Sequence, residues 1–197
     1  MSDIILASGS ASRRSLLSGA GVMAKNIKPL VDEESARASF RASGMSVRDQ
    51  AMQLAEMKAV KVSSNHTGLV IGGDQMLSLE GKPFDKPIGM DGARSHLKAM
   101  SGKAHTLETA IVIAENGTPV WRHLARPKLT MRVLTETFID QYLETAGEDI
   151  LNTVGAYQLE GIGAQLFTKI EGDYFSILGL PLLPLLDYLR TRGVLPA

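Results

Sequence analysis

IILASGSASRR, residues 4–14, joins a predicted strand to a predicted helix. The apolar run Ile4–Ala7 is typical of a short buried strand, which the following Ser-Gly-Ser brings to an end. A helix is expected from about Ala11, and two glycines, Gly19 and Gly21, would end it. The passage from strand to helix leaves free backbone N–H groups and the positive end of the helix dipole at one point.

Hydroxyl and guanidinium groups gather at this point. Ser8, Ser10 and Ser12 supply three hydroxyls, and Arg13 and Arg14 supply two cations. Together with the free N–H groups they would make a receptacle for phosphate. Because cations are poorly placed at a helix N-terminus unless an anion binds there, we expect the arginines to bind phosphate rather than to stabilise the fold. The alternative is a serine N-cap followed by two solvated arginines.

Strand and helix patterns alternate along the rest of the chain. A second buried strand is expected over Leu69–Ile71, broken by Gly72-Gly73 immediately before Asp74. Four further helices are expected: from Ser46 to about Ser64, from Asp91 to Met100, after Thr135 and from Pro181. The further strands are expected over His105–Ile113, which turns at Asn116-Gly117, and over 129–133. A hairpin is expected of Gln165–Ile170 with Tyr174–Leu178. The predicted fold class is α/β with a mixed sheet and flanking helices, rather than a doubly wound parallel sheet.

Two charged residues stand out against this predicted framework. Asp74 follows a buried strand through two glycines, so its carboxylate is well placed for metal binding or for work as a base. The alternative is an exposed acid in a turn. Lys58 lies four residues after Leu54 and four before Val62, near the apolar stripe of its helix, which favours a partly buried lysine. The alternative is a packed stem with its ammonium group in water.

Three loop segments carry further candidates. Val31-Asp32-Glu33-Glu34 has the carboxylates to coordinate a cation, and Phe84-Asp85-Lys86-Pro87 offers a lysine within reach of a phosphate. Gln158-Leu159-Glu160-Gly161 offers a side chain that could contact the edge of a ligand. Taken singly, these segments are equally compatible with a solvated acidic loop, a solvated lysine and an ordinary turn.

Composition excludes several classes of protein. The chain has 197 residues, of which 44% are apolar and 21% charged, and its net charge is zero. This balance is typical of a globular protein and argues against a dedicated nucleic-acid or membrane-surface binder. Phe175–Leu186, the longest apolar run, is shorter than the roughly 20 residues of a membrane span, and Ile4–Ala7 is too short for a signal peptide. The chain has no cysteine to form disulfides or thiolate sites, and we therefore expect a cytoplasmic protein. From the balanced charge and the short apolar runs we expect no membrane or nucleic-acid partner.

Common nucleotide- and metal-binding motifs are missing from the sequence. There is no Gly-x-x-x-x-Gly-Lys-Ser/Thr segment, and neither Gly19-x-Gly21 nor Gly161-x-Gly163 completes a dinucleotide fingerprint. The histidines have no zinc-ligand spacing; they are His66, His96, His105 and His123. Any nucleotide site must therefore use other segments.

Seven short blocks nevertheless occur in a recognisable order. They are Leu6-Ala7-Ser8-Gly9-Ser10 with Arg13-Arg14, Asp32-Glu33, Lys58-Ala59, Gly72-Gly73-Asp74, Asp85-Lys86-Pro87, Ser101-Gly102, and a last set of Gly155-Ala156-Tyr157, Glu160-Gly161 and Ile177-Leu178-Gly179-Leu180-Pro181. In these blocks the chain resembles, over nearly its whole length, the Maf family of nucleoside triphosphate pyrophosphatases. The resemblance implies one domain over residues 1–197, with two lobes around a central cleft and no separate linker. It also implies an elongated mixed-sheet fold related to the inosine triphosphatase architecture.

The resemblance implies an enzyme that hydrolyses the α–β phosphoanhydride of a nucleoside triphosphate to the monophosphate and pyrophosphate. A divalent cation, Mg²⁺ or Mn²⁺, is expected as cofactor, and a homodimer is expected because the family is often dimeric. In that family the aspartate matching Asp74 is the proposed proton acceptor. The rival function is a non-catalytic, nucleotide-binding regulator of cell division at septum formation. The rival enzyme is a housecleaning pyrophosphatase of damaged purine triphosphates on a related fold.

Each candidate residue receives a role from this resemblance. The residues expected to bind the triphosphate are Ser8, Ser10, Arg13, Arg14, Lys58 and Lys86. Glu33 and Asp74 are expected to serve the metal and the attacking water, with Asp74 as the catalytic residue. The candidate readers of the base are Ser12, Gln75 and Glu160.

The blocks depart from the common family pattern near the base-reading positions. The family commonly has a proline and then two arginines after the second serine, whereas Ala11 and Ser12 intervene here. The longer spacing, Gln75 and Glu160 resemble the branch that acts on 7-methyl-GTP, although that branch has tryptophan at the position of Ser12. The branch that acts on dTTP and UTP prefers threonine after the aspartate and glutamine at the position of Glu160. The pattern therefore favours 7-methyl-GTP or another modified nucleotide as substrate.

Overall fold

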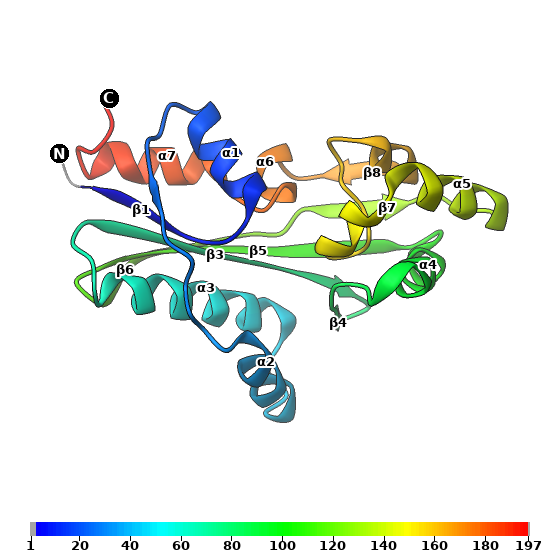
Figure 1. The fold of residues 1–197 in the computed structure, drawn as a ribbon, viewed down its shortest axis with the longest axis horizontal. Helices are drawn as coiled ribbons and strands as arrows, with labels where there is room; N and C mark the ends of the chain where they lie inside the picture. Colours follow the sequence, from blue (N-terminus) through cyan, green and yellow to red (C-terminus); the bar gives the residue numbers. More distant parts are fainter. Residues whose placement is uncertain (1–2, 197) are drawn as a thin grey trace. The chain divides into compact units, whose positions relative to one another are not determined.

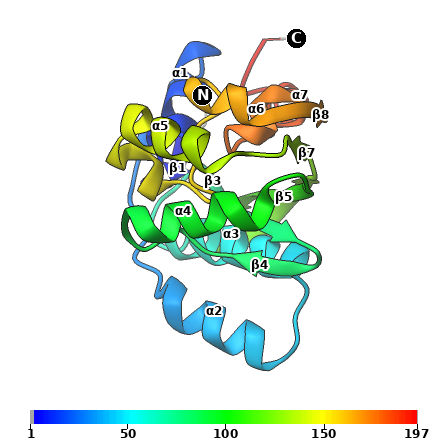
Figure 2. The same ribbon diagram turned by 90° about the vertical axis from the view of Figure 1, so that its right-hand side faces the viewer.

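The computed structural model describes residues 3–196, which form two compact units. Unit 1 comprises residues 3–75, 109–125 and 173–196, and unit 2 comprises residues 76–108 and 126–172. Figures 1 and 2 show the elements of each unit. Two long strands, one over residues 69–79 and one over residues 104–115, contribute residues to both units. The prediction of one domain over residues 1–197, with a cleft between two lobes, stays a prediction; Met1, Ser2 and Ala197 lie outside the described residues.

Unit 1 is a mixed sheet with helices on both faces. Its strands follow the order β2 (Lys25–Asn26), β1 (Ile4–Ala7), β3 (Leu69–Leu79), β5 (Ala104–Glu115) and β6 (Thr118–Ala125). Its helices are α1 (Ala11–Gly19), α2 (Glu33–Ala42), α3 (Val47–Ser63), α6 (Tyr174–Ile177) and α7 (Leu182–Thr191). Strand β1 pairs in parallel with both neighbours, whereas β5 and β6 pair antiparallel.

Alternation along β1 assigns the helices of unit 1 to opposite faces. Successive side chains of a strand point to opposite sides of the sheet. Ile4 and Leu6 pack in one core cluster with residues of α1 and α7. Ile5 and Ala7 pack on the other side with Val62 of α3. Helices α1 and α7 therefore cover one face and α3 covers the other, as Figure 1 shows.

Unit 2 is built from the remaining parts of β3 and β5 with shorter elements. It contains β4 (Lys82–Phe84), β7 (Lys128–Met131), β8 (Phe167–Glu171), α4 (Gly89–Met100), α5 (Glu136–Ala146) and the 3-10 helices η1 (Glu148–Asn152) and η2 (Ile162–Leu166). Strand β3 pairs antiparallel with β4, and β7 pairs antiparallel with both β5 and β8. Helix α4 packs on α5 and η1, and the core includes Leu97, Leu107 and Tyr142.

The expected break at Gly72-Gly73 is wrong. Strand β3 continues through both glycines to Leu79, so Asp74 lies inside the strand and not after its end. A Cβ atom on Gly72 would collide with the backbone oxygen of Ala55 and lie 2.8 Å from the Cβ of Ala59. Gly72 therefore lets α3 pack close to the sheet, which is a common use of glycine inside a strand.

Three other local expectations are also wrong. Tyr174–Leu178 is not a strand: residues 174–177 form α6, because Asp173 accepts a hydrogen bond from the backbone N–H of Ser176 and caps a helix. Helix α4 begins at Gly89, two residues before the expected cap at Asp91. The last helix begins after Pro181, which is its N-cap residue and not its first turn.

The remaining elements and the fold class are confirmed. Strand β1 and helices α1 and α3 occupy their predicted segments, Thr135 caps α5, and the hairpin turns at Asn116-Gly117. The sheet mixes parallel and antiparallel pairs and is flanked by helices, as predicted. Within residues 3–196, no helix combines the length and the apolar character that crossing a membrane requires.

Candidate active site

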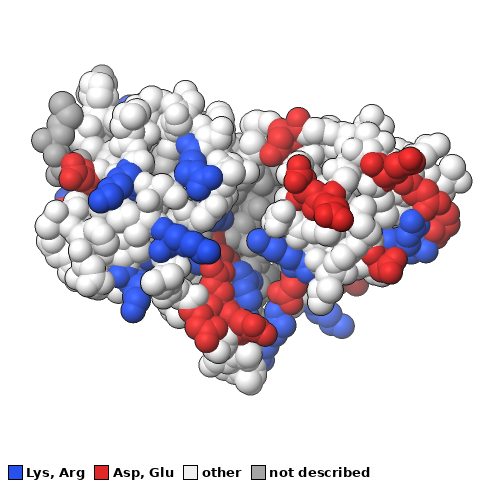
Figure 3. Space-filling view, viewed as in Figure 1, with Lys and Arg blue, Asp and Glu red and all other residues white. Residues whose placement is uncertain are grey.

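Two carboxylates and two cations meet in unit 1 and form a charge cluster of Glu33, Arg37, Lys58 and Asp74. The Nζ atom of Lys58 lies 2.7 Å from Oδ1 of Asp74 and 2.9 Å from Oε1 of Glu33. The Nη2 atom of Arg37 lies 3.3 Å from Oδ2 of Asp74 and 3.6 Å from Oε2 of Glu33. Figure 3 shows acidic and basic side chains adjoining over α2, which carries Glu33 and Arg37.

The charge cluster has a buried side and an open side. The side chains of Asp74 and Lys58 are only 6% and 8% exposed, whereas those of Arg37 and Glu33 are 22% and 41% exposed. Buried charges are tolerated when they are paired, so Lys58 stabilises Asp74 in the interior. The expectation that Lys58 is partly buried is confirmed, and the alternative with its ammonium group in water is wrong.

The local sequence explains how the four side chains converge. Asp32 accepts a hydrogen bond from the backbone N–H of Ser35 and caps α2, which places Glu33 in the first turn. Arg37 follows Glu33 by four residues and lies on the same helix face. The interpretation as a loop is therefore wrong for Glu33 and Glu34, which belong to α2, whereas Asp32 precedes the helix and is exposed.

The ion pairs change the protonation of Glu33. Burial of the Glu33 carboxyl acts to raise its pKa, but the charge and hydrogen bond of Lys58, followed by those of Arg37, outweigh burial. The pKa of Glu33 therefore lies below its ordinary value of 4.5. Glu33 is consequently ionised at neutral pH and available as a ligand for a cation.

Glu33 and Asp74 fit the requirements of a small divalent cation. Their carboxylates converge on the same Nζ atom of Lys58, so both present oxygen atoms to one region. Mg²⁺ is usually bound by one or two carboxylates together with water and substrate phosphates. The part of the chain that the structure describes holds no group of three or more His, Cys, Asp or Glu placed for a metal ion. A carboxylate pair completed by phosphate oxygens is therefore the arrangement that these residues suit.

The serine segment before α1 is organised around the hydroxyl of Ser8. The Oγ atom of Ser8 accepts hydrogen bonds from the backbone N–H of Ser10 at 3.1 Å and from Nη1 of Arg13 at 3.2 Å. Ser10 caps α1, so the serine N-cap of the alternative interpretation is present. The first turn of α1 carries no acidic residue, so its positive end is not neutralised from within the helix.

Arg13 is buried and has a second, structural partner. Its Nε atom donates a hydrogen bond of 2.7 Å to the backbone oxygen of Gly179. Burial lowers the pKa of Arg13, while the charges of Asp74 and Glu33 oppose that shift, so Arg13 acts electrostatically on the charge cluster. Gly73 leaves room for this arginine, because a Cβ there would lie 3.1 Å from Nε. The alternative of two solvated arginines is therefore wrong for Arg13, while its binding of phosphate stays a prediction.

The other predicted site residues of unit 1, Ser12, Arg14 and Gln75, differ in their exposure and in their hydrogen bonds. Arg13 is buried whereas Arg14 is exposed, so the two arginines do not point the same way. Ser12 is half-buried. The Nε2 atom of Gln75 donates to Oγ1 of Thr109 at 2.8 Å and to the backbone oxygens of Ser176 and Ile177 at 3.0 and 3.1 Å. These bonds engage the amide nitrogen of Gln75, and its role in reading the base stays a prediction.

Lys86 and Glu160 belong to unit 2, and both are exposed. Lys86 follows β4 in a loop, and Glu160 lies in the turn before η2. The two residues are on separate segments of unit 2, and their assignments as phosphate- and base-binding residues stay predictions.

Sequence reasoning missed Arg37 and the Gly179 carbonyl. A signal for Arg37 was present, because Asp32 followed by two acids is typical of a helix start and places Arg37 four residues after Glu33. No local pattern indicates the bond between Arg13 and Gly179, which are 166 residues apart. Only the packing of α1 near the segment before α7 creates it.

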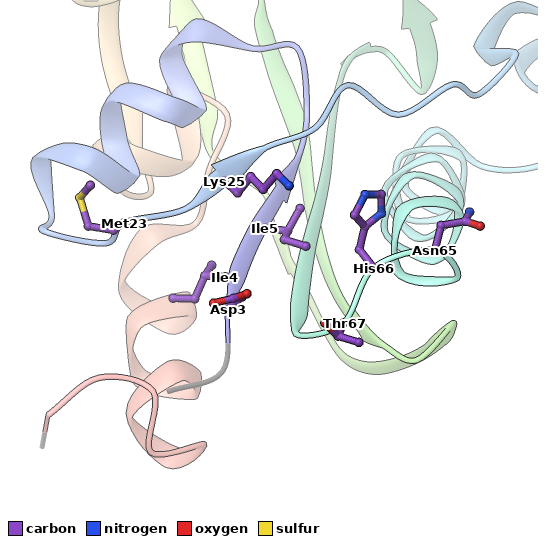
Figure 4. A pocket seen from close by; sticks show the side chains of 8 residues that line it. All are labelled: Asp3, Ile4, Ile5, Met23, Lys25, Asn65, His66 and Thr67. Atoms are coloured by element: carbon purple, nitrogen blue, oxygen red, sulfur yellow. The ribbon is translucent and has the colours of Figure 1, made fainter.

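A cavity of about 510 Å³ lies elsewhere in unit 1. Figure 4 shows its lining residues, which include Asp3, Lys25, His66 and Thr67. Asp3 and Thr67 precede β1 and β3, whereas Ser8 follows the end of β1. The cavity therefore lies at the opposite end of β1 from the serine segment and contains none of the predicted site residues.

The chain is similar over nearly its whole length to several named proteins. The chain is 66% identical to a protein of Hyphomonas neptunium named nucleoside triphosphate pyrophosphatase, over 98% of each chain. It is 51% identical to a protein of the same name from Rhodospirillum rubrum, over 98% of this chain and 96% of that one. It is 50% identical to a 7-methyl-GTP pyrophosphatase of Mesorhizobium japonicum, over 98% of this chain and 97% of that one. Residues 3–192 match the family described as Maf-like protein, and the chain belongs to that family.

Proposed function

We propose that this chain is a nucleoside triphosphate pyrophosphatase that hydrolyses the bond between the α- and β-phosphates. The observation that carries the proposal is the charge cluster: two converging carboxylates and a buried lysine, under the electrostatic influence of Arg13. This arrangement supplies oxygen ligands for a cation beside groups that bind anions. The names of the relatives that cover nearly the whole chain support the same activity.

In the proposed reaction, a water oxygen bonds to the α-phosphorus and the bond from that phosphorus to the bridging oxygen breaks. Pyrophosphate leaves, and a group in the site must accept the proton that the water molecule loses. Ser8, Arg13, Arg14 and Lys58 would hold the phosphate oxygens by charge and hydrogen bonds, with Lys86 as a further phosphate ligand.

Glu33 and Asp74 are the residues that would hold Mg²⁺ or Mn²⁺. When bound, such an ion neutralises phosphate charge and acidifies water. Asp74 is the proposed catalytic residue, either as proton acceptor or as metal ligand. Lys58 keeps the Asp74 carboxylate in place through the 2.7 Å contact and balances its charge.

The test is product analysis with pure protein, nucleoside triphosphates and Mg²⁺ or Mn²⁺. We expect equal amounts of monophosphate and pyrophosphate, resolved by phosphorus NMR, and no inorganic phosphate. Asp74→Asn protein from the same preparation controls for contaminating enzymes. A nucleotide that binds without any release of pyrophosphate would favour the rival, a regulator of cell division that acts by contact.

For the base, we propose a preference for 7-methyl-GTP or another modified guanine nucleotide. Glu160 supports this, because a carboxylate can accept hydrogen bonds from N1–H and the exocyclic amine of guanine, which thymine and uracil do not offer together. A mismatch of such bonds costs about 1–3 kcal/mol, or roughly one to two decades in kcat/KM. We therefore expect Glu160→Gln to shift the ratio of kcat/KM values from guanine toward pyrimidine triphosphates. An unchanged ratio would remove Glu160 from base recognition and leave Ser12 and Gln75.

The assembly and the location of the enzyme are also proposals. A homodimer would appear as twice the chain mass of 21.2 kDa in light scattering of the purified protein. A single domain would give one unfolding transition in calorimetry, whereas two independent units would give two. A cytoplasmic location agrees with the absence of cysteine, and fractionation of cells would test it.

A further inference from the structure

The proposed function leaves Arg37 without a role, although Arg37 contacts both carboxylates assigned to the cation. Its Nη2 atom lies 3.3 Å from Asp74 and 3.6 Å from Glu33. Lys58 contacts Oδ1 of Asp74, and Arg37 contacts Oδ2. Both oxygens of Asp74 therefore already face a positive charge. A divalent ion that binds Asp74 must approach one of these cations closely and is repelled by it.

The two cations are not held equally. Lys58 makes the shorter contacts, 2.7 and 2.9 Å, and its side chain is 8% exposed. Arg37 makes the longer contacts and its side chain is 22% exposed. Helix α2, which carries Arg37, has no buried residue. The Arg37 side chain can therefore move toward water at a lower cost than Lys58.

We propose that Arg37 is a stand-in cation for the divalent ion. It neutralises Glu33 and Asp74 while no ion is bound, and it leaves them when an ion binds. The inference rests on the proposed function, because it takes the Glu33–Asp74 pair as the place of the ion. Two negative and two positive charges balance in the charge cluster, so an added ion would repel a guanidinium that stayed within a few ångströms.

Displacement gives Arg37 a second use in the same site. A released guanidinium keeps its charge and its five N–H donors, which suit phosphate oxygens. The anion can then engage Arg37 only after the ion has replaced it on the carboxylates. The ion and the triphosphate would therefore favour each other's binding through Arg37.

The test measures Mn²⁺ binding to metal-free protein without nucleotide, by the electron paramagnetic resonance signal of free Mn²⁺. We expect Arg37→Gln to lower the Mn²⁺ dissociation constant about five- to tenfold, since the ion no longer competes with the guanidinium. Arg37→Lys keeps a competing charge and should stay near the wild-type value. The matched control is Arg48→Gln, which removes an exposed arginine from the first turn of α3 with the same change in net charge.

Thermal unfolding gives a second measurement on the same variants. Without metal, Arg37→Gln should unfold at a lower temperature than wild type, because Glu33 and Asp74 then share one cation. Added Mn²⁺ should raise its Tm by more than it raises that of the wild type. If Arg37→Gln does not fold without metal, Arg37→Met, which keeps an aliphatic side chain there, takes its place.

Several results would overturn the inference. These are unchanged or weaker Mn²⁺ binding by Arg37→Gln, equal tightening in Arg48→Gln, or no Mn²⁺ binding by either the wild type or Arg37→Gln. If any of these results is found and the wild type still releases pyrophosphate, the proposed function stands and only the role of Arg37 fails. If no variant releases pyrophosphate while Mn²⁺ binding changes as expected, the proposed function fails and the stand-in role stands.

Discussion

Asp74 in unit 1 and Glu108 in unit 2 are both buried carboxylates, but they are paired in different ways. Glu108 is held by one arginine through two parallel bonds, 2.8 and 2.9 Å from Nε and Nη2 of Arg126. Asp74 is held by two cations that also contact Glu33. The pair at Glu108 is complete in itself, whereas the charge cluster can exchange one partner for another. The first pairing suits a carboxylate that stabilises the fold, and the second suits the catalytic role proposed for Asp74.

The largest expected effect is the loss of activity in Asp74→Asn. The substitution keeps the shape of the side chain and removes its charge, so it would remove either role proposed for Asp74, proton acceptor or metal ligand. Loss of general-base help alone lowers kcat by about 10²–10⁴-fold, and we expect a decrease of at least about a hundredfold with folding intact. Steady-state assays of pyrophosphate release, with circular dichroism to check the fold, measure it. Turnover near the wild-type value would transfer the role to Glu33 or Glu34.

Arg126→Ala tests the other side of the comparison. The side chain of Glu108 is 3% exposed, so removing Arg126 leaves a buried charge without its partner. The pair is buried only on the side of Glu108, because the side chain of Arg126 is 57% exposed. Leaving the buried carboxylate unpaired should cost about 3 kcal/mol of unfolding free energy, while kcat per folded molecule should be retained. Urea unfolding measures the loss, and Glu108→Gln, which leaves only the exposed arginine unpaired, should cost less. Loss of kcat without loss of stability would mean that Glu108 belongs with Asp74.

A smaller effect is expected from Gly72→Ala, which tests how the charge cluster is positioned. The new Cβ would collide with the backbone oxygen of Ala55, so α3 and its Lys58 must move away from β3. Overpacking of this kind costs about 1–3 kcal/mol, and the shift should also lower kcat. Gly9→Ala is the control for stability, because a Cβ there has no neighbour within 4 Å and should change the unfolding free energy by less than about 0.5 kcal/mol. If Gly72→Ala is as stable as Gly9→Ala, the close approach of α3 is not needed.

Gly72 also shows how far sequence reasoning reached. Apolar patterns and caps predicted β1, α1, α3 and the mixed sheet, because these depend on residues close together in the chain. Two adjacent glycines predict the end of a strand, but β3 continues through them because Gly72 packs against α3, a contact that the local sequence does not show. The contacts of Lys58 with Asp74 and Glu33 join three separate segments and arise only from packing. The candidate residues were therefore predictable singly, and their mutual arrangement was not.

The smallest expected effect concerns Glu33, the open side of the charge cluster, and appears as a dependence of stability on pH. The pKa of Glu33 is lowered in the folded protein, so its ionised form stabilises the fold above its ordinary value of 4.5. That contribution declines as the pH falls below 4.5 through the folded-state pKa. In metal-free buffer, wild type should exceed Glu33→Gln in unfolding free energy at pH 6, and the difference should shrink toward pH 3.

Glu34→Gln is the matched control for this measurement, since Glu34 is the next residue in the first turn of α2 and lies outside the charge cluster. Its difference from wild type should change less between the two pH values. Because the Glu33 side chain is 41% exposed, water screens its ion pairs, and added salt should reduce the difference further. A difference for Glu33→Gln that is the same at pH 6 and pH 3 would show that the ion pairs with Lys58 and Arg37 do not stabilise the fold. Glu33 would then be held in place by the cap of α2 alone. A cation that displaced Arg37 from Glu33 would in that case break no stabilising contact.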